Sequence, residues 1–153
     1  MIGSPKQLSP KNVQLESPNE EIFKIIKSDK NYETLAQQIT KVESQLFYKI
    51  QPSELFDNHW QDTKEKAPTI CSLIDRFNKT SDWVATLIFM AESQDVSRTK
   101  VIAFFIEIVG YLHQFHNYNG IMAIMAALHR EDVQKLTEDW AVKSISPKFF
   151  SEN

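Results

Sequence analysis

The side chains best suited to chemistry in this sequence are three histidines. His113 and His116 are three residues apart and would lie on one face of a helix, where they could share a metal ion with nearby acids, and His129 is a more distant third ligand. They lack the HExxH arrangement and the neighbouring cysteine pair of common zinc sites. We therefore expect no metal site, and a metal-dependent or hydrolytic helical enzyme remains as an alternative.

Nucleophilic and nucleotide-binding motifs are also missing from the sequence. Cys71 follows Ile70 in an apolar helical pattern, which favours a packed thiol over a nucleophile, and there is no GxSxG motif. The three glycines, Gly3, Gly110 and Gly120, cannot form a loop that wraps backbone N–H groups around a phosphate. We expect no catalytic residues and no cofactor.

The elements that would position functional side chains are helices. Ser17, Pro18 and the capping-box acid Glu20 resemble a helix start and predict a short helix through Ile26. Apolar residues at helical spacing predict a helix from Asn31 that ends before Pro52, and a helix from Pro68 to Ile88 that is either continuous or broken at 78–81. A stronger pattern at 101–115 carries two apolar stripes, one of which contains Ile102, Ile106 and Val109.

The segment FHNYNGIMAIMAALHR at 115–130 predicts a central helix. Asn117 or Asn119 can cap its first turn, and Gly120 would let another backbone approach closely. Ile121, Ile124 and the methionines supply bulk, while the alanines leave room for neighbouring helices. No stretch shows the period-two alternation of strands. We expect an all-α fold, a multi-helix orthogonal bundle around a central buried helix.

Length and composition are those of one globular domain. The chain has 153 residues, 42% of them hydrophobic and 24% charged, and a net charge of -3, which argues against nucleic acid as a partner. Residues 1–17 are rich in proline and serine and predict a flexible lead-in to a domain at 18–153. A single cysteine, no secretory signal and no run long enough to span a bilayer predict a cytoplasmic protein without membrane insertion.

Five sequence blocks resemble the catalytic domain of the guanine-nucleotide exchange factors for Ras-type GTPases. They are LAQQIT at 35–40, IQPSELF at 50–56, LIDRFNKTSDWVAT at 73–86, KVIAFFIEI at 100–108 and FHNYNGIMAIMAAL at 115–128. The blocks have the family's order and similar spacing over residues 31–140. The resemblance implies a helical domain whose concave face grips the switch regions of a small GTPase, while a helical hairpin opens the nucleotide site.

The same resemblance implies a set of GTPase contacts at matching positions. They are Trp60, Leu73, Phe77, Asn78, Met122, Ala126 and His129. Trp60 stands out because it lies in a polar stretch with no periodic reason to be in the core, as expected of an aromatic anchor. His129 replaces the asparagine usual in the family, and Arg130 to Asp132 add charge, so partner choice is expected to differ.

The family's hairpin would follow the block that ends near Trp140, and the sequence ends at Asn153. We therefore expect the N-terminal portion of the domain, which docks on a Ras-like GTPase at a membrane but exchanges nucleotide poorly by itself. Without the rest of the domain, apolar side chains would be left uncovered and would favour self-association. These side chains are Ile121, Ile124, Met125 and the stripe that contains Ile102, Ile106 and Val109. A non-catalytic helical adaptor is the main alternative.

Overall fold

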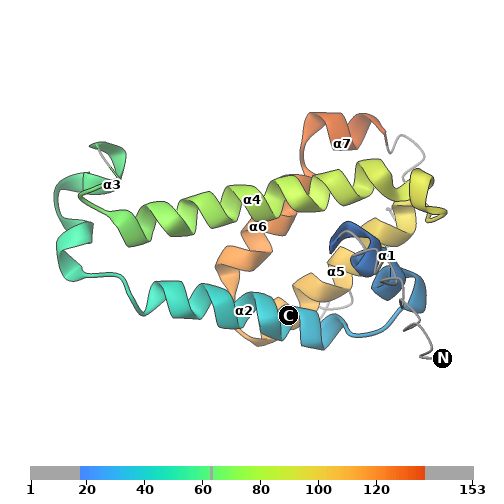
Figure 1. Cartoon of the computed structure of the whole chain (residues 1–153), viewed down its shortest axis with the longest axis horizontal. Helices are drawn as coiled ribbons and strands as arrows, with labels where there is room; N and C mark the ends of the chain where they lie inside the picture. Colours follow the sequence, from blue (N-terminus) through green and yellow to red (C-terminus); the bar gives the residue numbers. More distant parts are fainter. Residues whose placement is uncertain (1–17, 63, 137–153) are drawn as a thin grey trace, which may run out of the picture.

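The computed structural model describes residues 18–62 and 64–136 as a bundle of helices (Figure 1). The elements are α1 (Pro18–Ser28), α2 (Tyr32–Phe47), the 3-10 helix η1 (Pro52–Asn58), α3 (His59–Asp62), α4 (Pro68–Met90), the 3-10 helix η2 (Ala91–Gln94), α5 (Arg98–Gln114), α6 (Tyr118–Leu128) and α7 (Glu131–Lys135). These ranges contain no strand, which confirms the all-α prediction. The expected lead-in at 1–17 lies outside the described residues.

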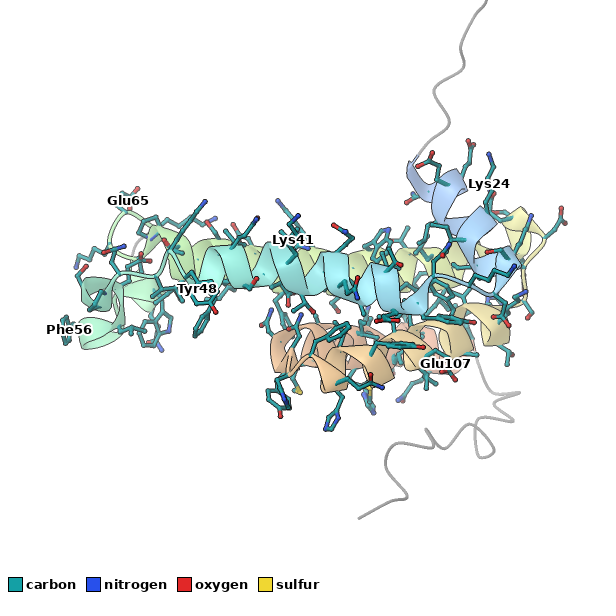
Figure 2. All side chains as sticks on the ribbon, turned by 90° about the horizontal axis from the view of Figure 1, so that it is seen from below. Lys24, Lys41, Tyr48, Phe56, Glu65 and Glu107 are labelled. Atoms are coloured by element: carbon teal, nitrogen blue, oxygen red, sulfur yellow. The ribbon has the colours of Figure 1, made fainter. Side chains whose placement is uncertain are left out.

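The helices form two layers of unequal length. The long helices α2 and α4 lie side by side in one layer, and α5 and α6 pack against them in the other (Figures 1 and 2). Helix α6 contacts α2, α4, α5 and α7, so it is central as the sequence predicts. Figure 2 shows that α5 and α6 extend under only part of α2 and α4, toward the α1 end. At the opposite end of this layer, which carries η1 and α3, none of the described helices forms a second layer beneath it.

Helix α5 provides the largest share of the core because nearly all of the residues in its two apolar stripes are covered. Phe104 and Phe105 meet edge to face with ring centroids 5.6 Å apart, and Trp83 of α4 packs on Phe105 at the same centroid distance. Such edge-to-face pairs are favourable because the positive ring edge of one aromatic meets the negative face of the other. The core therefore lies at the end of the molecule where α1, α2, α4 and α5 converge.

The location of the uncovered apolar surface differs from the sequence prediction. Ile102, Val109 and Ile124 are fully packed, although they were expected to lack partners. Neighbouring helices bury these side chains because α6 lies directly against both α4 and α5. The large apolar side chains that are exposed lie mainly near the other end of the molecule, and include Phe47, Tyr48, Leu55, Phe56, Ile74, Tyr118 and Met122.

Helix α4 is continuous across the segment where a break was considered. Its 23 residues run without interruption from Pro68, which occupies the first turn, where its missing N–H costs nothing. Ser81, the last residue of the polar segment 78–81, is buried. One straight helix therefore connects the core to the end of the molecule that carries η1 and α3 (Figure 1).

Candidate functional site

A buried acid holds η1 across the start of α4. The Glu54 carboxylate is 4% exposed and accepts hydrogen bonds from the backbone N–H groups of Thr69 at 2.8 Å, Ile70 at 3.1 Å and Gln51 at 3.4 Å. Burial by itself would raise the pKa of Glu54, but these hydrogen bonds hold the pKa below its ordinary value. Glu54 thus caps α4 from a position fifteen residues upstream of Thr69 and fixes the turn that carries Leu55.

A second buried side chain fixes the start of α6. Asn117 Oδ1 accepts the N–H of Gly120 at 2.9 Å, and Asn117 Nδ2 donates to Thr40 Oγ1 on α2 at 3.1 Å. Asn117 is therefore the N-cap, and exposed Asn119 is not. A Cβ on Gly120 would lie 3.0 Å from Asn117 Nδ2. The side chain of the cap therefore requires glycine here, whereas the sequence had suggested the close approach of another backbone.

Asn117 and Leu55, the neighbour of Glu54 in sequence, line a cavity of about 670 Å³, which we call the end pocket. It lies between the C-terminal half of α2, the segment from Ile50 to Trp60, the start of α4 and the turn into α6. Its lining is mostly apolar and aromatic: Thr40, Glu43, Ser44, Phe47, Tyr48, Ile50, Leu55, Trp60, Ile70, Leu73, Phe115, His116, Asn117, Tyr118 and Asn119. Tyr48 points toward the side on which α6 lies (Figure 2). The pocket is concave and largely apolar, as ligand and partner sites commonly are.

Two of the predicted contact residues line the end pocket. Trp60 and Leu73 are both half-buried, and they reach the pocket from α3 and α4. The Cys71 thiol is buried and donates to the Trp60 carbonyl oxygen at 3.9 Å, which agrees with the prediction of a packed thiol. The hydrogen bond from Cys71 therefore helps to fix the Trp60 backbone, in addition to the packing of the Trp60 ring.

The other predicted residues lie along two helices that pack against each other. On α4, Phe77 is half-buried and Asn78 is exposed. On α6, Met122 is 60% exposed, and Ala126 and His129 follow it at helical spacing. Helices α4 and α6 are in direct contact, so these two groups of residues lie on neighbouring helices.

Sequence reasoning missed two exposed apolar residues in the same region. Ile74 is the neighbour of Leu73 on α4, and Tyr118 lies one helical turn before Met122 on α6. Both side chains are exposed. Ile74 follows the same helical spacing as the buried residues of α4, and that spacing cannot show that α6 covers only part of the length of α4. We call Leu73, Ile74, Phe77, Asn78, Tyr118, Met122, Ala126 and His129 the α4–α6 surface.

The charged loop after α6 is paired within the molecule. Arg130 Nη1 lies 2.8 Å from Asp82 Oδ1 on α4, and Arg130 Nη2 lies 3.0 Å from Asp132 Oδ2. The side-chain hydrogen bond to Asp132 raises the pKa of Arg130, and the same bond lowers the pKa of Asp132. His129 Nδ1 lies 2.8 Å from the Met125 carbonyl oxygen, which orients the ring at the end of α6. These contacts hold the loop in one arrangement beside the α4–α6 surface.

The histidines considered as metal ligands have aromatic neighbours. The rings of His113 and His116 each pack against Tyr118, with centroids 6.3 Å apart in both pairs. In the part of the chain that the structure describes, no three His, Cys, Asp or Glu side chains are grouped so that they could hold a metal ion. Among the same described residues, no helix has both the length and the apolar character needed to cross a bilayer.

Comparison with known proteins identifies one family. Residues 34–151 match the RasGEF domain. The chain is 36% identical to Ras guanine nucleotide exchange factor A of Dictyostelium discoideum over 87% of its own length, and 34% identical to Ras guanine nucleotide exchange factor Q of the same organism over 91%. It spans only 21% of the first relative and 11% of the second.

Proposed function

Because the chain belongs to the RasGEF domain family, we propose that it is the portion of an exchange-factor domain that docks on the switch region of a Ras-like small GTPase. Together with the helical hairpin that follows this portion in the resembling family, it would promote GDP release. The proposed contacts are Trp60 and the α4–α6 surface. A GTPase held at a membrane would recruit the protein there.

The observation that carries the proposal is the exposed apolar character of α6. This helix is apolar on every side, yet Met122 is 60% exposed, and the neighbouring α4 adds exposed Ile74. Packing the core does not require these outward side chains, and apolar residues gathered on one surface are typical of protein-binding sites. The residues that match the family's contact positions are among those that form this surface.

The mechanism proposed for this surface is binding linkage. A protein that binds the nucleotide-free GTPase more tightly than the nucleotide-bound form weakens nucleotide binding by the same factor, because the two equilibria share one thermodynamic cycle. No covalent step and no catalytic side chain are needed. The residues of the α4–α6 surface act only through their differential affinity for the two forms.

The test is a comparison of affinities across a panel of Ras-like GTPases. We expect the chain to bind at least one nucleotide-depleted GTPase more tightly than the same GTPase loaded with GDP. Met122→Glu should abolish this binding, whereas Phe89→Glu, at an exposed apolar position nearer the other end of α4, should preserve it. Equal affinity for the depleted and loaded forms across the whole panel would overturn the proposal.

A further inference from the structure

Arg130 connects the two helices of the α4–α6 surface. Its Nη1 donates to Asp82 Oδ1 on α4 at 2.8 Å, although the two residues are 48 positions apart in the sequence. Asp82 lies one helical turn after Asn78 on the same face of α4, and Arg130 directly follows His129 at the end of α6. This ion pair therefore links the contacts proposed on α4 to those proposed on α6.

The same guanidinium also fixes the loop between α6 and α7. Arg130 Nε and Nη2 donate to the two oxygens of Asp132 at 3.2 and 3.0 Å. Asp132 Oδ1 in turn accepts the N–H of Val133 at 2.9 Å, and the Val133 side chain is fully buried in the core. A lysine could not reproduce this arrangement, because its ammonium is a compact point charge without the planar fork of donors.

These pairs use the charges that the sequence suggested for partner choice. The Arg130 side chain is 38% exposed, but Asp82 and Asp132 already lie against it. Glu131, the remaining acid of the loop, is paired with Lys135 on α7 at 2.7 Å. Each charged side chain of the loop thus has an opposite charge beside it. The loop is therefore better suited to act on a partner through its position than through an unpaired charge.

We infer that Arg130 is a positioning residue for docking on the GTPase: by binding Asp82, it sets where His129 and the end of α6 lie relative to α4. This inference rests on the proposed function and deepens it. Isolated exposed ion pairs contribute little to stability, because water screens both charges. Arg130 differs from such pairs because one planar group makes three hydrogen bonds to carboxylates on two different helices, α4 and α7.

The end of α6 depends on this link because the helix that follows it is short. Helix α7 has only five residues, and a helix of this length is not stable without tertiary contacts. The His129 ring is itself tied to α6, since its Nδ1 lies 2.8 Å from the Met125 carbonyl oxygen. A shift of the end of α6 would therefore move His129 away from Asn78 on α4.

The experiment measures affinity for the Ras-like GTPase that the 153-residue chain binds most tightly in its nucleotide-depleted form. Asp82→Asn and Arg130→Gln should each weaken this binding by about three- to tenfold. The double variant should bind no more weakly than Arg130→Gln alone, because both changes break the same pair. Arg130→Lys should not restore the affinity, whereas Asp82→Glu, which keeps a carboxylate, should lose less than Asp82→Asn. Lys135→Gln, which breaks the pair with Glu131 inside α7, is the control and should bind like the wild type.

Hydrogen exchange of the free chain provides a readout that does not involve the GTPase. The backbone amides of residues 129–133 should exchange about three- to tenfold faster in Asp82→Asn than in the wild type, because the loop opens locally more often. The Tm should change by less than about 2 °C, since the core is untouched. Lys135→Gln should leave the exchange of these amides unchanged.

The outcomes separate positioning from direct contact. If Arg130 touched the GTPase itself, Asp82→Asn would free its guanidinium, and the affinity would stay the same or rise. That result, or unchanged exchange at 129–133, would overturn the positioning role. If the wild type binds a GTPase and Arg130→Gln binds it equally well, only this inference is wrong. If the wild type binds no GTPase in the panel, the proposed function fails and this inference fails with it.

Discussion

Glu54 links two parts of the chain through one carboxylate. It accepts the N–H groups of Thr69 and Ile70 at the start of α4, where the positive end of the helix dipole also favours a negative charge. Because α3 and the wall of the end pocket follow η1 directly, the position of Trp60 depends on this cap. Loss of the Glu54 carboxylate would therefore be expected both to destabilise the start of α4 and to shift Trp60.

The first prediction concerns the pH dependence that Glu54 adds to stability. Its pKa is lowered in the folded protein, so its contribution is present above the pKa of the unfolded chain and is lost as pH falls through the folded pKa. Glu54→Gln should lower the Tm at pH 7 by about 2 to 8 °C, as for the loss of a helix cap. The difference from the wild type should shrink as pH falls below about 4.

Thermal melts of both proteins between pH 7 and pH 3 provide the measurement. Glu65→Gln, at an exposed position, is the control and should match the wild type. A constant difference between Glu54→Gln and the wild type over the whole pH range would contradict the assignment of the cap to the ionised carboxylate.

The second prediction concerns Trp60 as an anchor for the GTPase. Trp60→Ala should weaken binding of a nucleotide-depleted Ras-like GTPase by about 1 to 3 kcal/mol, as is common for aromatic anchors at interfaces. The Tm should change little, because the ring is half-buried at the pocket and lies outside the main core. Binding titrations and melts of Trp60→Ala are the measurements, with Phe56→Ala as the exposed aromatic control. A large fall in Tm without a specific loss of affinity would make Trp60 a packing residue.

At the scale of elements, the junction between α5 and α6 sets the position of the exposed helix face. His116 adopts the left-handed backbone conformation with φ 55°, which turns the chain between the two helices. Asn117 then caps α6 and bonds to Thr40 on α2. The direction in which Met122 faces thus depends on one buried amide that connects two helices distant in sequence.

The third prediction is that Asn117→Ala lowers the free energy of unfolding by about 1 to 3 kcal/mol, because it removes a cap and leaves Thr40 without its donor. Denaturant unfolding measures this loss. Combining Asn117→Ala with Thr40→Val should give a smaller loss than the sum of the two single changes, because the two side chains share one hydrogen bond. Asn119→Ala, at an exposed position in the same turn, is the matched control and should stay within about 0.5 kcal/mol of the wild type. Equal losses at Asn117 and Asn119 would refute the role of the cap.

At the scale of the whole molecule, the proposed docking on a GTPase and the release of nucleotide can be tested separately. The α4–α6 surface and the end pocket both lie within residues 18–136. The hairpin that opens the nucleotide site in the resembling family is expected beyond Trp140. A protein shifts the equilibrium between the two forms of a GTPase only by the difference between its affinities for them, so a small preference for the nucleotide-depleted form gives a small effect.

The fourth prediction is that the 153-residue chain releases nucleotide poorly by itself. Excess chain should accelerate the loss of a fluorescent GDP analogue from Ras-like GTPases by less than about tenfold, which is a lowering of the release barrier by less than about 1.4 kcal/mol, because the hairpin that opens the nucleotide site in the resembling family is expected beyond Trp140. The complete domain of Ras guanine nucleotide exchange factor A serves as the positive control. Strong acceleration by the chain alone would show that its own residues open the nucleotide site.

The sequence alone was sufficient to predict the class of fold and the identity of most helices. Helical spacing of apolar residues is a local property, so α1, α2, α4, α5 and α6 could be predicted from it, and the ordered blocks pointed to the family that the comparison then showed. The spacing could not decide whether residues 78–81 break α4. Asn, Thr and Ser side chains can hydrogen-bond to the nearby backbone, and they occur both inside helices and at helix ends.

Only the tertiary structure decided which apolar residues are covered and which polar residues are satisfied. Ile102 and Ile74 have similar apolar patterns in the sequence, yet neighbouring helices cover Ile102, whereas Ile74 is exposed on α4. Glu43 and Glu54 are both glutamates eleven residues apart, and only the fold brings backbone N–H groups to Glu54 and leaves Glu43 without donors. Burial and hydrogen bonding depend on residues distant in sequence, and helical periodicity contains no information about which distant residues those are.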